Sequence, residues 1–336
     1  MKYKLRPYVL SLRITERCNV GCPHCSLSAK PTGRDMPIDL AYEAIHKASS
    51  LGIGLLHISG GEPLLYPDLP AIVAEGRANG MVVEMVTSTF TNRGNEKYDL
   101  DLLGRVAEAG LSTILLSYDD GHARCVSLEK FIQFTQHAIN LGLDICIFCI
   151  DSPHFLITTE KLEEVFSHKG IDINKLHWAS GMFSGVGRGE SPQYEEVPQR
   201  KILFNRCPYV MPVPTLTPEG KFLLCPCSIL TSKYFIIGDY YVEGMDNVFY
   251  NFEHSPIYRM LGKYGPHLSL LKCGLGEKEL PFEMCEACKK YLDFIDTKSE
   301  SECVEIFKNQ NLNDIFVDFE ALLQPHKRYL HDHIQL

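Results

Sequence analysis

The first two thirds of the sequence predict an α/β fold built around a parallel sheet. Six short apolar runs between residues 8 and 180 are separated by five longer amphipathic stretches, and each amphipathic stretch ends in glycine. Repeated strand–helix units favour parallel strands joined by right-handed crossovers. The sheet is therefore either an open doubly wound sheet or part of a (β/α) barrel.

Each element has its own signal. The strands are short apolar runs, expected at 8–14, 54–60, 82–88, 112–118, 144–150 and 175–180. The helices have apolar residues at helical spacing, expected at 39–52, 69–80, 100–110, 128–142 and 159–170. In either arrangement the active site is expected at the carboxyl ends of the strands.

The strand–helix pattern stops at 181–193, a glycine-rich polar segment that we interpret as a linker. Short β-like segments follow at 213–227, where "PEG" predicts a hairpin turn, and at 234–242, before a helix at 255–265. The sequence thus predicts a small second domain with an amphipathic helical tail. The predicted domains are 1–190, 191–300 and 301–336.

Composition excludes several classes of function. Hydrophobic residues make up 45% of the 336 and charged residues 22%, which is ordinary for a soluble protein. The net charge of −9 argues against nucleic acid as the main partner, because a phosphate backbone needs a basic surface. No apolar run reaches membrane-spanning length and no signal peptide is recognisable. A cytoplasmic location without a membrane partner is the expectation.

The 13 cysteines are the most informative residues. In a reducing compartment they indicate metal or redox chemistry rather than a disulfide scaffold. Three lie near the start of the chain, three lie in its middle and seven lie after residue 200. The middle three, Cys125, Cys146 and Cys149, are expected to be core residues of helices or strands, because free cysteine packs as a small hydrophobe. Two sulfur-rich regions predict two metal sites.

The stretch "RCNVGCPHC" places Cys18, Cys22 and Cys25 in one loop after the first predicted strand. Iron–sulfur clusters are normally held by four thiolates, so three would leave one iron open to a substrate or cofactor. The alternatives are a zinc site that takes a distant fourth ligand and a set of reduced core cysteines.

A second motif helps to interpret the cysteine loop. "SGGEPLL" follows the second predicted strand and contains Gly60, Gly61, Glu62 and Pro63. With this pair of motifs, residues 8 to about 190 resemble the radical S-adenosylmethionine (radical SAM) superfamily. One departure is His24, where the family often has an aromatic residue. The resemblance implies a partial (β/α)6 TIM-like barrel, and a 4Fe–4S cluster on the three cysteines whose open iron binds S-adenosylmethionine (SAM).

The resemblance also implies a chemistry. An electron from the reduced cluster would cleave SAM, and the resulting 5′-deoxyadenosyl radical would take a hydrogen atom from the substrate. An electron donor such as flavodoxin or ferredoxin is implied as a partner. Glu62 would accept a hydrogen bond from the methionine ammonium group, next to glycines that let the backbone approach the ligand.

Further candidate contacts follow later strands. Ser88 comes after the third strand, Ser117 and Asp119 lie in the "SYDDGH" segment after the fourth, and Arg188 lies after the sixth. By resemblance, the first three would contact SAM or substrate, and Arg188 would pair with a carboxylate. A turn or capping role is the alternative for each.

The second cysteine set resembles the family's C-terminal auxiliary-cluster domains, called SPASM with two clusters and twitch with one. We expect a small α+β domain with one auxiliary 4Fe–4S cluster, held by Cys207, Cys225, Cys285 and Cys288. Structural zinc would suit four thiolates equally. Cys227 and Cys273 remain, and each is either a cluster ligand or, for Cys227 above all, a hydrogen-atom donor to the substrate radical.

These features predict a radical SAM enzyme that acts on an unactivated C–H bond of a peptide or small natural product. Epimerisation with Cys227 as hydrogen donor is the first expectation. Formation of a thioether or carbon–carbon cross-link, or dehydrogenation, is the alternative. A non-catalytic metal-binding interaction protein is the alternative from another class.

Overall fold

In the computed structural model, the chain folds into two compact units. The described residues are 8–89, 96–151, 155–182, 185–190, 206–207, 209–210, 212–226, 232–308, 310 and 312. The α/β unit contains Val9–Pro23 and Ala29–Phe183. The C-terminal unit contains Tyr8, His24–Ser28 and the described residues of Ser184–Phe319.

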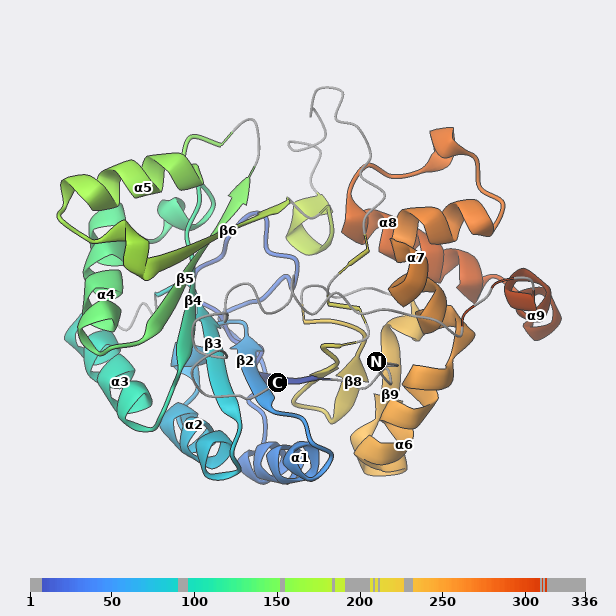
Figure 1. The fold of residues 1–336 in the computed structure, drawn as a ribbon, viewed down its shortest axis with the longest axis horizontal. Coiled ribbons are helices and arrows are strands. Elements are labelled where there is room, and N and C mark those ends of the chain that lie inside the picture. The colour runs from blue at the N-terminus through green and yellow to red at the C-terminus, as the bar shows by residue number, and fades with distance from the viewer. Residues whose placement is uncertain are drawn as a thin grey trace. The chain divides into compact units, whose positions relative to one another are not determined.

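Six parallel strands form the sheet of the α/β unit (Figure 1). They are β1 (Val9–Thr15), β2 (Leu55–Gly60), β3 (Val82–Thr87), β4 (Thr113–Ser117), β5 (Asp144–Asp151) and β6 (Leu176–Met182). Their order in the sheet is the order in the chain. A doubly wound sheet reverses its strand order at one point, whereas a barrel does not. The sheet therefore has barrel-type winding.

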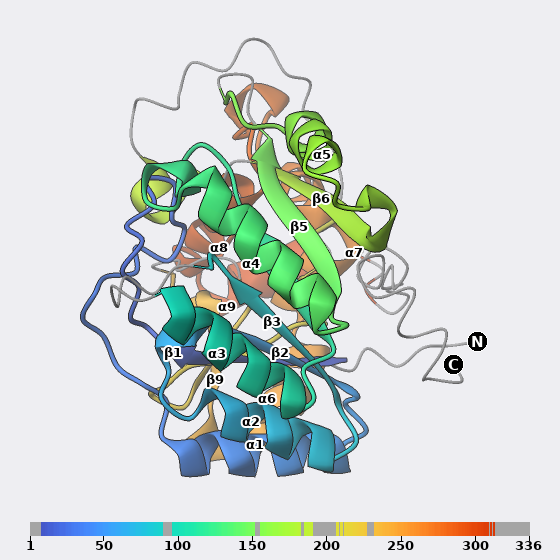
Figure 2. The same ribbon diagram turned by 90° about the vertical axis from the view of Figure 1, so that its left-hand side faces the viewer.

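Five helices connect these strands and cover one face of the sheet (Figure 2). They are α1 (Ile38–Ser50), α2 (Leu69–Ala78), α3 (Glu96–Glu108), α4 (Leu128–Asn140) and α5 (Thr159–His168). All predicted strands and helices of this unit are confirmed, and the largest shift is the earlier start of α3. Ser127 and Thr158 begin α4 and α5 with side-chain caps on the backbone nitrogens of Lys130 and Lys161.

The two faces of the sheet differ in polarity, because side chains alternate along each strand. Leu56 and Val83 lie against α2, and Tyr118 stacks on Phe131 of α4. The opposite face carries polar residues even in mid-strand. His57 of β2 pairs with Glu84 of β3, with 2.5 Å between Nδ1 and Oε1, and Ser11, Arg13 and Thr113 share this face.

The C-terminal unit combines a small antiparallel sheet with helices. Its elements are β7 (Thr215–Leu216), β8 (Lys221–Leu223), β9 (Ile236–Asp239), α6 (Tyr240–His254), α7 (Pro256–Lys272), α8 (Met284–Asp296) and α9 (Glu300–Lys308). The predicted hairpin is confirmed. The strand predicted to continue to residue 242 ends at Asp239, because the Asp239 side chain accepts from the Tyr241 nitrogen and starts α6.

The predicted linker is only partly described, with a short 3-10 turn at Gly187–Glu190. The predicted tail begins with α9, and its residues from 313 on lie outside the described chain. The domain boundaries stay a prediction. Among the described helices, none has the length and apolar character needed to cross a bilayer.

Candidate functional site

The cysteine loop leaves the carboxyl end of β1, where parallel-sheet proteins place their sites. Cys18 and Cys22 are buried, and Cys25 is half-buried. The Cys18 nitrogen donates to the Lys30 carbonyl over 2.7 Å, and the Glu16 nitrogen donates to the Arg34 carbonyl over 2.9 Å. These hydrogen bonds hold the first part of the loop, residues 16–18, against residues 30–34.

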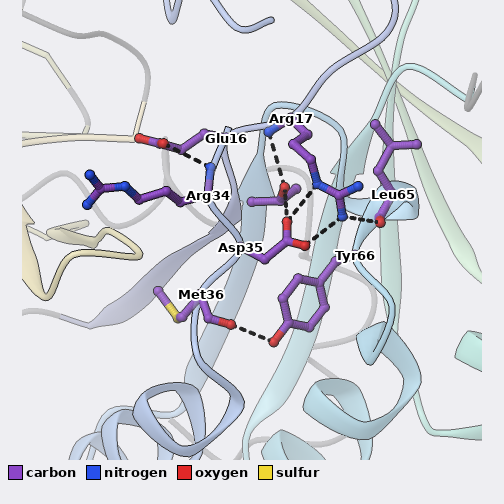
Figure 3. A network of polar contacts seen from close by, with 8 residues as sticks. Glu16, Arg17, Arg34, Asp35, Met36, Leu65 and Tyr66 are labelled. Carbon is purple, nitrogen blue, oxygen red and sulfur yellow. Dashed lines mark hydrogen bonds and ion pairs between the residues drawn. The ribbon is translucent and has the colours of Figure 1, made fainter. Parts of the chain in front are cut away.

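The side chain of Arg17, next to Cys18, further fixes the first part of the cysteine loop (Figure 3). The Arg17 guanidinium donates to both carboxylate oxygens of Asp35, over 2.9 and 2.6 Å, and to the Leu65 carbonyl over 2.8 Å. The Thr15 hydroxyl donates to the same carboxylate over 2.6 Å. Such bidentate pairs fix orientation as well as position. Sequence analysis did not single out Arg17 and Asp35, whose only signal was a basic residue beside the first cysteine.

The GGEP segment lies directly on the backbone of this loop. The Gly61 nitrogen donates to the Thr15 carbonyl over 2.7 Å, and the Glu62 nitrogen donates to the Arg17 carbonyl over 2.8 Å. A Cβ on Gly61 would lie 2.3 Å from the Arg17 carbonyl oxygen. Glycine is therefore required at position 61 by the close approach of two backbones.

Glu62 is buried, and its carboxylate is engaged by the protein itself. Oε1 accepts from the Leu64 nitrogen and the Thr87 hydroxyl, over 3.1 and 2.6 Å. Oε2 accepts from the Ser88 nitrogen and hydroxyl, over 2.9 and 2.6 Å. Burial raises the pKa of Glu62, and these four bonds oppose the rise. Four hydrogen bonds use about all the acceptor sites of a carboxylate.

The end of β3 is shaped by the same contacts. Ser88 lies beside Glu62, and its hydroxyl donates a hydrogen bond to Glu62 Oε2. Thr89 has a φ of 67°, a conformation that β-branched residues rarely adopt, and its nitrogen donates to the Thr87 hydroxyl over 2.9 Å. Strained backbone of this kind concentrates at functional sites. Pro63 is buried at the start of a 3-10 turn, Pro63–Leu65.

The segment after β4 returns to the cysteine loop. Ser117 ends β4 half-buried, and Asp119 is fully buried, its Oδ1 accepting from the backbone nitrogens of Gly121 and His122 over 2.8 and 3.1 Å. The Cys125 thiol donates to the Val20 carbonyl over 2.7 Å. The prediction that Cys125 is a core residue is wrong, because it lies exposed on this loop. The same prediction is confirmed for Cys146 and Cys149.

Within the C-terminal unit, Arg188 lies at the third cysteine. The Arg188 nitrogen donates to the Cys25 carbonyl over 3.0 Å. The preceding Gly187 has a φ of 63°, and a Cβ there would lie 2.5 Å from the Ser26 carbonyl oxygen. The 3-10 turn after β6 thus packs on the backbone of Cys25 and Ser26.

Four other cysteines of the C-terminal unit come together from distant parts of the chain. Cys285 and Cys288 lie three residues apart on α8, so they share one face. Burial raises the pKa of the Cys288 thiol well above its usual 9.0, and the neighbouring thiols of Cys225, Cys207 and Cys285 raise it further. Burial and Cys285 raise the pKa of Cys207 to about 11. These are the four auxiliary residues that the sequence singled out. Four thiols gathered in this way suit an iron–sulfur cluster, whose usual ligands are four thiolates, and would also suit a structural zinc ion.

The remaining cysteines are placed differently. Burial raises the pKa of Cys273 to about 11, and its neighbouring thiol is Cys303 rather than a member of the quartet. Tyr291 interacts with Cys273, Cys288 and Cys303. Cys227 lies outside the described residues.

Comparisons with known proteins agree with this geometry. Residues 12–154 match the Radical SAM superfamily. The chain is 34% identical over 158 residues to the PqqA peptide cyclase of Xanthomonas euvesicatoria pv. vesicatoria (strain 85-10), a match that covers 44% of this chain and 41% of that protein. It is 32% identical over 116 residues to the PqqA peptide cyclase of Streptomyces rochei, covering 34% and 30%. The match thus spans less than half the length of these relatives.

A solved structure resembles nearly the whole chain. Native anSMEcpe with bound AdoMet and Kp18Cys peptide has a TM-score of 0.56 at 12% identity, covering 96% of each chain. At this identity the likeness concerns the fold. The predicted α/β fold of the partial TIM-barrel type is confirmed.

Proposed function

This chain carries a radical SAM domain, and on that premise we propose that it is an enzyme that abstracts hydrogen from an unactivated C–H bond. The observation that carries the proposal is the docking of Gly61 and Glu62 on the backbone of Thr15 and Arg17, at the base of a loop with three cysteines. A metal-binding interaction protein has no need for a glycine motif fixed against an incomplete ligand set. The alternative from that class is therefore disfavoured.

We assign the SAM-binding 4Fe–4S cluster to Cys18, Cys22 and Cys25. When bound, the reduced cluster supplies the electron that cleaves SAM to methionine and a 5′-deoxyadenosyl radical. The chain's own residues hold the site in shape: Arg17 and Asp35 fix the base of the loop, and Glu62 fixes Ser88. Because the Glu62 oxygens already accept four hydrogen bonds, we propose that Glu62 orients the β3 end more than it binds the methionine ammonium group.

The remaining predicted contacts stay candidates for SAM or substrate binding, with the exception of Asp119. Each of these candidates lies at or after the carboxyl end of a strand. They are the backbone of residues 60–63, Ser88, Ser117, Asp119 and Arg188. Asp119 is distinguished among them, since its Oδ1 atom serves its own loop. We therefore propose Ser88 and Ser117 as direct contacts and Asp119 as a residue that shapes the β4 loop.

A twitch-type auxiliary 4Fe–4S cluster is proposed on Cys207, Cys225, Cys285 and Cys288. Its support is the electrostatic influence of the other three thiols on Cys288, which indicates that the four lie near one another. We leave Cys273 out of the proposed ligand set, because the thiol that influences its pKa is Cys303. The auxiliary site would supply an electron acceptor or a substrate-binding position.

A peptide is the proposed substrate. The matched relatives are named peptide cyclases, and the solved structure with a similar fold contains a peptide. A cyclase closes a ring by forming a bond, so these relatives favour cross-linking over the epimerisation that the spare Cys227 suggested. Epimerisation with Cys227 as hydrogen donor is the second candidate.

One assay separates these outcomes. The protein is reconstituted anaerobically with iron and sulfide, and is then incubated in heavy water with dithionite as the reductant, SAM and the peptides encoded beside its gene. Cross-linking predicts a peptide that loses two hydrogen atoms and takes up no deuterium. Epimerisation predicts one deuterium at unchanged composition, abolished in Cys227→Ala. Unmodified peptides together with SAM cleavage would point to a non-peptide substrate.

A further inference from the structure

The backbone of Cys25 is held from two sides within the C-terminal unit. Its carbonyl oxygen accepts from the Ser28 nitrogen over 3.1 Å and from the Arg188 nitrogen over 3.0 Å, which uses both lone pairs of the oxygen. Ser28 has a φ of 50°, a left-handed conformation that persists in a serine only where the surrounding structure holds it. The turn from Cys25 to Ser28 therefore depends on support from outside, and the hydrogen bond from Arg188 is part of that support.

The support comes from residues 185–188, which lie after β6. Gly187 packs on the turn so closely that a Cβ there would lie 2.7 Å from the Cys25 carbonyl oxygen. Val186 is fully buried, and its carbonyl oxygen accepts from the Gly189 nitrogen over 3.1 Å. The segment is therefore anchored in the middle, and a shift of its first residue is passed on to the contact with Cys25.

The first residue of this segment, Gly185, lies against α8. A Cβ on Gly185 would lie 2.6 Å from the Cδ atom of Glu286, and closer still to Oε1. The Glu286 carboxyl group thus occupies the space that a side chain at position 185 would take. Glu286 belongs to the first turn of α8 and follows Cys285. A continuous series of contacts therefore runs from α8 through residues 185–188 to Cys25.

We propose that Glu286 is a positioning residue for Cys25: its carboxyl group holds residues 185–188 in place, and these residues hold the backbone of the third cysteine. The inference rests on the proposed function, in which Cys25 is a cluster ligand. Groups behind a ligand fix its orientation, and their loss weakens metal binding although they do not touch the metal. Glu286 touches no reacting atom in this account and acts only through the intervening backbone.

The competing explanation is that Glu286 packs passively on Gly185 and contributes only to general stability. The two explanations differ in which cysteines lose protection when the contact is broken. Positioning predicts that Cys25 becomes reactive faster while the auxiliary ligand Cys288 keeps its protection. General loosening of the C-terminal unit predicts that both cysteines become reactive faster.

The same unit offers a matched control, a second contact between a glycine and a glutamate. A Cβ on Gly276 would lie 3.4 Å from Glu279 Oε2, an ordinary contact distance. Gly276 precedes the 3-10 turn Glu277–Glu279, and its nitrogen donates to Glu279 Oε2 over 2.8 Å. Gly276→Ala therefore adds the same methyl group beside a glutamate without displacing it.

The test compares wild type with Gly185→Ala, Glu286→Ala, Glu286→Gln, the double variant Gly185→Ala/Glu286→Ala and the control Gly276→Ala. Each protein is reconstituted anaerobically with iron and sulfide, and an iron chelator is then added together with iodoacetamide. Proteolysis and tandem mass spectrometry at successive times give the alkylation rate of each cysteine separately. The readout needs neither SAM nor turnover.

Gly185→Ala and Glu286→Ala are each expected to speed alkylation of Cys25 by about fivefold, the lower end of the usual coupling between separate sites, and to leave the rate at Cys288 unchanged. Glu286→Gln keeps the shape of the side chain and should recover most of the protection. Both substitutions to alanine break one contact, so the double variant should match the single variants rather than multiply their effects. Gly276→Ala should behave as wild type.

Three results overturn the inference: a wild-type rate at Cys25 in both single alanine variants, equal acceleration at Cys25 and Cys288, or multiplied effects in the double variant. If Gly185→Ala does not fold, Glu286→Ala carries the test, and a wild-type rate at Cys25 there overturns the inference. If Cys25 of the reconstituted wild type reacts as fast as in protein without iron, no cluster is held there. The proposed function then fails, and the inference fails with it.

Discussion

The carboxylate of Glu62 accepts two hydrogen bonds from Ser88, one from its backbone nitrogen over 2.9 Å and one from its hydroxyl over 2.6 Å. This contact ties the motif after β2 to the end of β3. The Glu62 backbone also donates to the Arg17 carbonyl over 2.8 Å. One buried residue therefore links three neighbouring strand ends of the site.

Glu62→Gln is expected to destabilise the protein by about 1–3 kcal/mol, the cost of an unsatisfied buried group. Each carboxylate oxygen accepts from one backbone nitrogen, Leu64 or Ser88, so either orientation of the amide leaves a backbone N–H without its acceptor. Chemical denaturation measures the change. Glu108→Gln, at an exposed residue near the end of α3, is the control and should differ little from wild type. Equal stability of both variants would contradict the assigned contacts.

Gly61→Ala is expected to displace the cysteine loop, because the added Cβ would lie 2.3 Å from the Arg17 carbonyl oxygen. Iron bound by the three N-terminal cysteines should fall strongly, while iron at the auxiliary site should not. Gly104→Ala is the matched control in α3, where an added Cβ meets nothing within 4 Å. That substitution should stabilise by about 0.5–1 kcal/mol. Full iron loading in Gly61→Ala would show that the close approach does not matter.

Cys288→Ala is expected to remove the auxiliary cluster and so to lower the iron content by about four atoms per chain. Cys273→Ala should keep the full content, because Cys273 lies with Cys303 instead of the quartet. Both contents are measured by iron and sulfide analysis after anaerobic reconstitution. Zinc bound stoichiometrically in place of iron, or equal losses in both variants, would refute the auxiliary assignment.

Asp239→Ala is expected to cost about 1 kcal/mol, as loss of a helix cap does. The Asp239 carboxylate caps α6 and pairs with Lys221, and the hydrogen bond from Lys221 lowers its pKa below the ordinary 3.8. A lowered pKa stabilises the fold above pH 3.8, and this contribution is lost as the pH falls through the folded-state value. Lys221→Ala, which removes the pair and keeps the cap, should cost less. Unfolding curves at pH 7 and below pH 3.8 test both points.

The repeated strand–helix pattern was sufficient to predict the barrel part of the fold. Each element there has its own periodic signal, and the order of βα units leaves few ways to arrange the sheet. The end of the strand in residues 234–242 was harder to predict, because the apolar and aromatic residues continue past Asp239, where the strand ends. The cap that stops the strand is a single side-chain hydrogen bond.

The site was predictable where chemistry requires a fixed spacing and unpredictable where only folding brings residues together. The three cysteines and the GGEP segment are local motifs. Arg17 and Asp35 lie 18 residues apart with no motif to connect them, and Cys125 lies 105 residues from Val20. Glu62 and Ser88 were both predicted as site residues, but the hydrogen bonds that join Glu62 to Thr87 and Ser88 form only when β2 and β3 lie side by side.

The central claim, that the three N-terminal cysteines hold a cluster that cleaves SAM, is tested most directly by measuring 5′-deoxyadenosine. The anaerobically reconstituted protein is incubated with SAM and dithionite, and the product is quantified by liquid chromatography with mass spectrometry. The account predicts 5′-deoxyadenosine from the wild type and none above background from a variant with alanine at Cys18, Cys22 and Cys25. Equal product from both proteins, or none from a fully loaded wild type, would contradict it.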